Sequence, residues 1–455
     1  MRRLGLAAAA LALLGALSLR ALSARERYFD TDELEHLHAA LLVAHRAVPF
    51  RDFFEHHGPL FWAALAPAVA REPSAYAMAE AGRALMSAFW LAMLALAARP
   101  RPDADPLEGA AAAVLLSFFG AFAMKSLEIR PDLPAAFLLA AAGVAAASDR
   151  RDAGAWTGAL CAFGAWFSPK IVFGAAGLAA ASLARRPRGE RARFAGETAI
   201  AALLVAALGL AALAALGALG AFWRECVLFN ARFRSGAGAW AFTLEPSLAL
   251  DGPTWILGLL GLASWRRRPE ESGIFAGALA GLFVSPSAYA QYLLFVAPSL
   301  CALAATALAR AVGEGRGARA RGVLAAAVVL AACARPAAAQ LALARAGNAL
   351  QRARWACVER LVPPGARVFD VWSGDAFMRP HAAAIWFFPD DEQANLNEDW
   401  VVDGMIAGLR DPRTRAAVRC DSCLARLPAR LSREIERDYA PSGCGRLWLR
   451  RGAAR

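Results

Sequence analysis

Acidic and histidine side chains are concentrated in one short segment, residues 28–62, which holds five of the six histidines. Asp30, Asp32 and Glu33 open this segment, and carboxylates there could serve as a general base or bind a metal ion. Acids are also favoured in the first turn of a helix, so Asp30 is explained equally well as a helix cap. Two further acids are not needed to start a helix, and we therefore predict chemistry at Asp32 and Glu33.

A second polar group follows in the stretch RDFFEHHGP, which contains Arg51, Asp52, His56 and His57. Arginine and histidine there could bind a phosphate, while the alternative is an interfacial turn anchored by its aromatic residues. The histidines at 36, 38, 56 and 57 are also compatible with zinc. Because such spacing is common by chance, the sequence predicts no metal ligands.

Other polar candidates lie singly at the ends of apolar runs. Proline suits the first position of a helix, so Arg130-Pro131-Asp132 begins one run, and its Arg and Asp either pair with each other or face a ligand. Only two of the 50 basic residues are lysines, Lys125 and Lys170. A compact ammonium suits a phosphate, although chance retention of two lysines explains them equally well.

Long apolar runs must position these side chains. The chain has 455 residues, is 58% hydrophobic and has a mean hydropathy of +0.39, which is too apolar for a soluble protein of this size. Membrane spans are predicted near 4–22, 74–98, 108–124, 131–148, 153–168, 170–184, 198–222, 253–265, 272–288, 289–310 and 322–340. We therefore predict a mainly α, polytopic transmembrane bundle of about 11 spans over residues 1–340.

Residues 341–455 contain no such run and are predicted to form a small soluble α/β domain. Strands are expected at 366–372, 414–420 and 446–450, with a helix at 398–410. Cys357, Cys420, Cys423 and Cys444 fall in this domain, where one or two disulfides are expected. The Cys420-Asp-Ser-Cys423 spacing also fits a zinc or redox motif, but a single such pair is a weak signal.

The net charge of +12 does not indicate nucleic acid, because arginines gather in connections such as 185–193, 266–268 and 310–321. This is the positive-inside pattern of a membrane protein. It places the N-terminus in the cytoplasm, and both the 28–62 segment and the C-terminal domain outside a bacterial-type inner membrane. Residues 1–24 are expected to be an uncleaved span, with a cleaved signal peptide as the alternative.

The outer loop 23–73 is predicted to contain an amphipathic helix at 33–48, whose leucines repeat at helical spacing. Pro49 ends this helix, and Asp30 with Glu33 has the form of a capping box. The helix is expected to lie flat on the outer membrane face, with Asp32 and Glu33 at its start.

The same segment resembles the membrane glycosyltransferases of the GT-C type, in the family-39-like branch of protein O-mannosyltransferases and lipid A aminoarabinose transferases. The resemblance lies in Asp32-Glu33 after the first span, then Val48-Pro49-Phe50-Arg51-Asp52-Phe53 and Glu55-His56-His57-Gly58-Pro59-Leu60. Arg130-Pro131-Asp132 is similar to the second acidic motif of these enzymes, and Tyr292 to Pro298 to their late span preceded by tyrosine.

The resemblance implies inverting transfer of a sugar from a polyprenyl-phosphate donor to a cell-envelope acceptor, which is a lipid, glycan or protein. Asp32 would be the general base, assisted or oriented by Glu33. Cations for the leaving phosphate would come from Lys170, Arg130, His56, Arg232 or Arg234. No cofactor is predicted, with a divalent ion at Asp30, Asp32 and Asp132 left as an alternative.

The main competing hypothesis is a transporter or flippase of lipid-linked glycans without enzymatic activity. A transporter is expected to carry ionisable or helix-breaking residues in the middle of its spans. Here the polar residues gather at the outer ends of the spans instead, which favours chemistry on a lipid headgroup.

Overall fold

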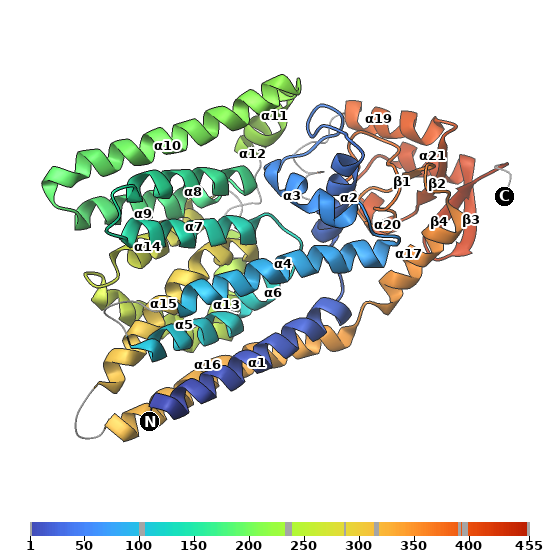
Figure 1. Cartoon of the computed structure of the whole chain (residues 1–455). Coiled ribbons are helices and arrows are strands. Elements are labelled where there is room, and N and C mark those ends of the chain that lie inside the picture. The colour runs from blue at the N-terminus through green and yellow to red at the C-terminus, as the bar shows by residue number, and fades with distance from the viewer. Residues whose placement is uncertain are drawn as a thin grey trace. The chain divides into compact units, whose positions relative to one another are not determined.

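The computed structural model describes residues 2–99, 105–232, 239–285, 288–313, 318–389, 393 and 399–452. The chain is mainly helical with a small sheet near its C-terminus, which confirms the predicted fold class (Figure 1). It divides into two compact units. Unit 1 comprises Met1–Arg27, Met86–Ala211 and Gly236–Ala346, and unit 2 comprises Tyr28–Leu85, Ala212–Ser235 and Gly347–Arg455. The predicted division of the chain at residue 340, between a membrane domain and a soluble domain, stays a prediction.

Unit 1 is built from helices. These are α1 (Arg2–Glu26), α5 (Pro106–Phe118), α6 (Gly120–Lys125), α7 (Asp132–Ala147), α8 (Ala153–Phe167), α9 (Ile171–Arg185), α10 (Arg188–Ala215), α13 (Ala239–Gly261), α14 (Pro269–Val284), α15 (Leu293–Val312) and α16 (Ala318–Ala346). Helix α4 (Ala75–Ala98) is divided between the units, and the last residues of α10 also belong to unit 2. Every predicted span overlaps one of these helices.

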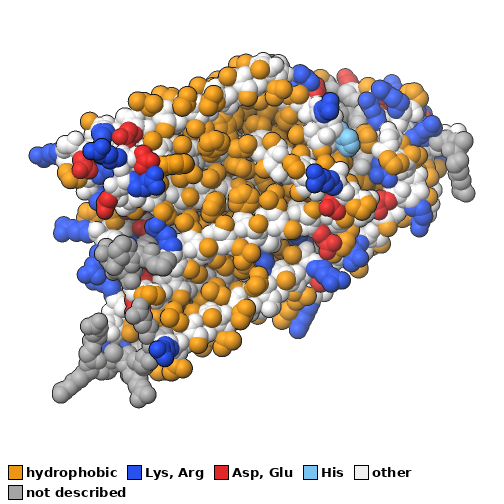
Figure 2. Space-filling model, in the orientation of Figure 1, with side chains coloured by type: hydrophobic (Ala, Val, Ile, Leu, Met, Phe, Trp, Pro, Cys, Tyr) orange, Lys and Arg blue, Asp and Glu red, His pale blue; other side chains and the backbone are white. Residues whose placement is uncertain are grey.

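Five helical segments of the described chain are long and apolar enough to cross a membrane: Arg3–Glu26, Ala75–Ala98, Arg188–Ala215, Ala290–Val312 and Ala320–Leu361. Helices α5, α7 and α9 are apolar but shorter than the ~20 residues that a full crossing needs. The exact number of spans, predicted to be about 11, stays a prediction. Leucines and an isoleucine on α10, such as Ile200 and Leu208, are exposed, and hydrophobic side chains cover this helix in Figure 2.

Close helix packing in unit 1 depends on small residues. Helices α9 and α14 lie side by side, and a Cβ atom at Gly177 would lie 2.0 Å from the carbonyl oxygen of Gly273. One turn later, a Cβ atom at Gly277 would lie 2.2 Å from the carbonyl oxygen of Phe173. Small residues at such spacing let backbones approach closely, as is typical of helix pairs in membranes.

Unit 2 combines short helices with the sheet. Its helices are α2 (Thr31–Ala44), α3 (Leu60–Val69), α11 (Leu219–Phe222), a π-helix (Trp223–Leu228), α12 (Phe229–Arg232), α17 (Ala349–Leu361), α19 (Asp399–Arg410), α20 (Asp421–Leu424) and α21 (Ala429–Asp438). Its strands are β1 (Arg367–Phe369), β2 (Thr414–Val418), β3 (Tyr439–Cys444) and β4 (Leu447–Arg450), in the order β1-β2-β4-β3. Strand β1 pairs with β2 in parallel, and the other two pairs are antiparallel.

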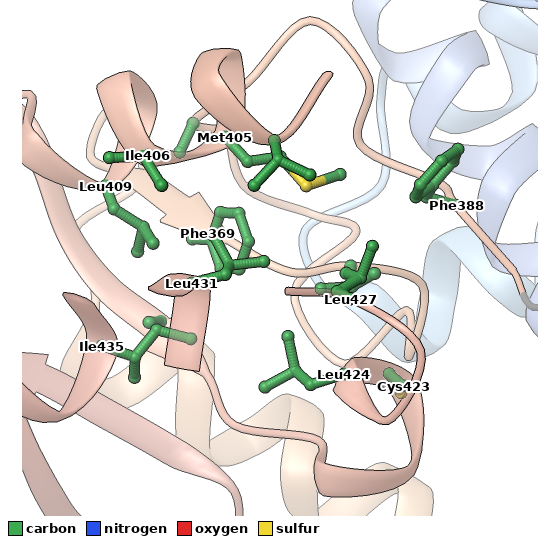
Figure 3. Packing of buried hydrophobic residues seen from close by; sticks show 14 of the residues in the cluster. Phe369, Phe388, Met405, Ile406, Leu409, Cys423, Leu424, Leu427, Leu431 and Ile435 are labelled. Carbon is green, nitrogen blue, oxygen red and sulfur yellow. The ribbon is translucent and has the colours of Figure 1, made fainter. Parts of the chain in front are cut away.

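The three predicted strands and the predicted helix of the tail are present, and the structure adds β3, α17 and α21. Strand β3 contains Pro441 and Gly443, which are disfavoured in strands and hide it in the sequence. Apolar side chains of β1, α19 and α21 form the core of this part, with Phe369, Leu409 and Leu431 almost fully buried (Figure 3).

Two disulfides close the C-terminal part. Cys357 pairs with Cys444 at a Cα separation of 6.0 Å, and Cys420 pairs with Cys423 at 5.1 Å. The expectation of one or two disulfides among these four cysteines is therefore confirmed.

Candidate functional site

The acidic segment forms the start of helix α2, as the capping box predicts. The Asp30 side chain accepts a hydrogen bond from the backbone N–H of Asp32 at 3.1 Å, and the Glu33 side chain accepts one from the backbone N–H of Asp30 at 2.9 Å. Asp30 and Asp32 are half-buried, whereas Glu33 is fully buried. Glu33 is therefore enclosed, whereas the two aspartates of the same helical turn stay partly exposed.

Glu33 is held by an arginine that the sequence reading missed. Arg83, on α4, is itself fully buried and donates to both oxygens of Glu33, at 3.0 and 2.8 Å. The same guanidinium donates to the Tyr28 carbonyl at 2.9 Å and lies 3.5 Å above the Phe29 ring. Through these contacts Glu33 helps to position α2. Its predicted catalytic role stays a prediction.

Side chains of α17 hold the residues that lead into α2. The Gln351 amide bonds both backbone groups of Phe29, accepting at 2.9 Å and donating at 3.0 Å, and the Trp355 ring centroid lies 5.4 Å from the Phe29 ring centroid. Because the backbone of Phe29 is bound on both sides, the following residues enter the helix along a defined path. A single glutamine far along the chain therefore sets where the acidic turn begins.

Helix α2 is also covered by the segment after β1. His38 Nδ1 lies 2.6 Å from the Phe377 carbonyl oxygen, and burial lowers the pKa of His38 to about 3. Leu34 packs directly against Gly374, whose φ of +71° places it in the left-handed region. Since Glu33 to Ala40 are all buried, α2 is an internal helix of unit 2, and its predicted place on the outer membrane face stays a prediction.

The two histidines after Pro49 lie beside two buried glutamates. His57 Nδ1 is 3.4 Å from Glu55 Oε2 and 3.9 Å from Glu35 Oε1, and the rings of His56 and His57 are 4.0 Å apart. One donor atom from each of these four residues lies within 4.8 Å of the others. This group, which we call the Glu/His cluster, has the ligand types of a divalent metal site.

Arg51 and Asp52 are paired with each other in the turn after α2. Their side chains are 2.8 Å apart, Asp52 accepts from the Val48 backbone N–H at 2.8 Å, and Arg51 donates to the Leu216 carbonyl at 3.0 Å. Arg232 is an exposed residue at the end of α12, and Arg234 lies outside the described residues.

The second acidic motif forms its own cluster in unit 1. Asp132, at the start of α7, is almost fully buried and accepts from the Ser168 hydroxyl and from Lys170 Nζ, both at 3.0 Å. Lys170 Nζ also lies 5.0 Å from the centroid of the Tyr292 ring, whose hydroxyl bonds Ser285 at 3.0 Å. The structure therefore brings together three predicted residues, Asp132, Lys170 and Tyr292.

Arg130 and the other lysine meet at a residue that was not predicted. Glu128 is fully buried and forms ion pairs with Arg130 at 2.7 Å, Lys125 at 2.9 Å and Arg27 at 2.7 Å. Burial disfavours its charged form, but the three cations outweigh that effect and lower the pKa of Glu128 to about 2. One carboxylate thus organises three cations.

Comparisons with known proteins identify the fold. No protein-family model and no curated protein sequence matches the chain. Its structure is similar to the crystal structure of ArnT from Cupriavidus metallidurans bound to undecaprenyl phosphate, with a TM-score of 0.65 and 13% identity over 92% of this chain and 94% of that chain. The apo form of that ArnT gives a TM-score of 0.62 and 14% identity with the same coverage.

A third similar structure is the apo crystal structure of the Archaeoglobus fulgidus oligosaccharyltransferase, with a TM-score of 0.52 and 12% identity over 90% of this chain and 69% of that chain. Together with the long apolar helices, these matches indicate a multi-pass membrane protein. The chain has the GT-C fold, as the resemblance of its acidic segment implied.

Proposed function

We propose that this protein is a membrane glycosyltransferase that moves a sugar from a polyprenyl-phosphate donor to an acceptor in the cell envelope. The observation that carries the proposal is the difference in contacts and solvent exposure among the three acids at the start of α2. Asp30 caps the helix, Glu33 is buried against Arg83, and Asp32 keeps part of its surface accessible to solvent. A partly exposed carboxylate in the first turn of a helix, where negative charge is favoured, is available to act as a general base.

In the proposed reaction, the acceptor hydroxyl attacks the anomeric carbon of the donor sugar while its proton passes to the Asp32 carboxylate. The bond between the anomeric carbon and the phosphate oxygen breaks, and the polyprenyl phosphate leaves with the bonding electron pair. One displacement inverts the anomeric configuration. Because the donor is already activated by its phosphate, the reaction needs no nucleotide.

The departing phosphate gains negative charge, and preorganised cations stabilise such charge. We propose Lys170 and Arg130 for this role because each is already oriented by a carboxylate, at 3.0 and 2.7 Å. The remaining predicted substrate contacts stay proposals for binding the donor or acceptor. They are Asp30, Arg51, Asp52, His56, His57, Asp132, Arg232, Arg234 and Tyr292.

Among the described residues, the Glu/His cluster has side chains that fit a divalent metal ion. No step of the proposed transfer depends on it. A bound ion there would add positive charge beside the buried carboxylates of Glu35 and Glu55.

The test is transfer of labelled sugar from polyprenyl-phosphate donors to an envelope fraction by the purified protein in liposomes. Asp32→Asn keeps the size of the side chain but removes the base, and we expect transfer to fall roughly 10²–10⁴-fold. The matched control is Glu80→Gln, which changes an exposed carboxylate on α4. Normal transfer by both Asp32→Asn and Glu33→Gln would contradict the proposal.

The same experiment separates the transferase from a flippase. A flippase moves the labelled lipid across the bilayer without forming a new glycosidic bond, whereas a transferase yields a labelled product. Mass spectrometry of envelope glycans from a deletion strain then identifies the sugar and the acceptor.

A further inference from the structure

The Glu/His cluster combines side chains from two segments of unit 2. Glu35 lies on α2, and Glu55, His56 and His57 lie in the turn that precedes α3. Both glutamates are more than nine-tenths buried. Burial of two carboxylates beside each other is costly unless their charge is compensated.

Hydrogen bonds account for only part of Glu55. Its Oε2 atom accepts from the His56 backbone N–H at 3.1 Å and lies 3.4 Å from His57 Nδ1. Its Oε1 atom is buried and has no hydrogen-bond partner among the described residues. A buried carboxylate oxygen without a partner, beside two imidazole rings, is the arrangement expected around a cation.

A third carboxylate increases the negative charge beside the cluster. Glu225, in the π-helix, accepts from the Glu55 backbone N–H at 3.2 Å. Three carboxyl groups therefore lie close together at this point of unit 2, and a cation there would offset their charge.

We propose that Glu35, Glu55, His56 and His57 bind one zinc ion. Imidazole nitrogen and carboxylate oxygen are both zinc ligands, and a mixed set of two of each suits zinc better than calcium or magnesium, which prefer oxygen alone. Bonds of about 2.1 Å in a tetrahedral site place ligand atoms about 3.4 Å apart. The donor atoms here lie within 4.8 Å of one another, so small side-chain rotations bring them to that distance.

The neighbours of the cluster support the orientation of its rings. The His36 ring lies edge-on to His57 at 4.8 Å, and Trp62 Nε1 donates to His36 Nδ1 at 3.2 Å. Asn230 donates to the carbonyl of His56 at 2.7 Å. The His36 ring thus packs against the His57 ring, and the bond from Asn230 holds the backbone of the turn.

A zinc ion in this place links the turn before α3 to α2, one turn after Asp32. Its proposed role is to position α2. This inference does not depend on the proposed transferase activity, since zinc content is measured without any substrate.

The test is the zinc content of the purified full-length protein, measured by mass spectrometry after dialysis against metal-free buffer. We expect stoichiometric zinc in the wild type and in the control His45→Ala, whose histidine is exposed at the end of α2. Glu55→Gln and His57→Ala should lose most of it. Glu55→Gln nearly preserves the shape of the side chain and so keeps the test valid if His57→Ala folds poorly.

A second measurement is thermal unfolding after removal of metal by a chelator. Added Zn²⁺ should raise the unfolding temperature of the wild type and of His45→Ala, and leave that of Glu55→Gln unchanged. Three results would overturn the proposal: a wild type that takes up no zinc, equal zinc in Glu55→Gln and His45→Ala, or stoichiometric binding of another metal in preference to zinc.

Discussion

The buried pair of Glu33 and Arg83 makes a quantitative prediction about the stability of α2. Replacing Arg83 with methionine keeps much of its volume but removes two hydrogen bonds to Glu33, at 3.0 and 2.8 Å, and the bond to the Tyr28 carbonyl. Each hydrogen bond to a charged group contributes about 1.5–3 kcal/mol. Because the variant leaves Glu33 buried without its cation, we expect a loss of about 3–5 kcal/mol in the free energy of unfolding.

Glu33→Gln should cost a similar amount, because it leaves the Arg83 charge buried instead. The double variant contains neither charge and should therefore lose at least about 2 kcal/mol less than the sum of the two single losses. Chemical denaturation in micelles, followed by circular dichroism, measures these values. Arg71→Met, at an exposed arginine, is the control. A loss in the double variant equal to the sum of the two single losses would refute this account of the acidic turn.

Three further predictions concern single residues. The pKa of Glu128 is lowered from 4.5 to about 2, so its ionisation adds about 3 kcal/mol to the free energy of unfolding above pH 4.5. This contribution is lost as the pH falls toward 2. Glu128→Gln should therefore flatten the dependence of stability on pH in that window. Gly374→Ala places a Cβ atom 2.4 Å from the Leu34 side chain at a positive φ and should cost about 2–4 kcal/mol in thermal or chemical unfolding, with partial recovery when Leu34→Ala is added. Under the proposed function, Lys170→Met should slow transfer more than Lys170→Arg does, and equal rates in both variants would exclude a need for charge at this position.

Much of the helical fold follows from local signals. Apolar runs separated by arginine-rich connections predict the positions of the helices, and Asp30 with Glu33 predicts the cap of α2, although this helix runs from Thr31 to Ala44 rather than over 33–48. The four cysteines of the tail predict one or two disulfides but not which cysteines pair. These features depend on residues that are close in sequence or on composition alone.

The partners of the acidic turn could not be predicted in the same way. Arg83 is one arginine among many, and the only sign of its role is a charge within an apolar run, which is costly unless it is paired. Gln351 carries no local signal at all. Glu35 and Glu55 come together only when the turn after α2 folds back, so the histidines alone did not define a ligand set.

Two of the contacts that hold α2 can form only late in the synthesis of the chain. Phe29 is bound by a residue 322 positions later in the chain, and His38 by one 339 positions later. At about 5–20 residues per second, the ribosome needs roughly 20–70 s to make the chain between them. During that interval the acidic turn and Arg83 have been synthesised, but Gln351 and Phe377 have not. Two of the contacts that hold α2 therefore form only when the last quarter of the chain has been made.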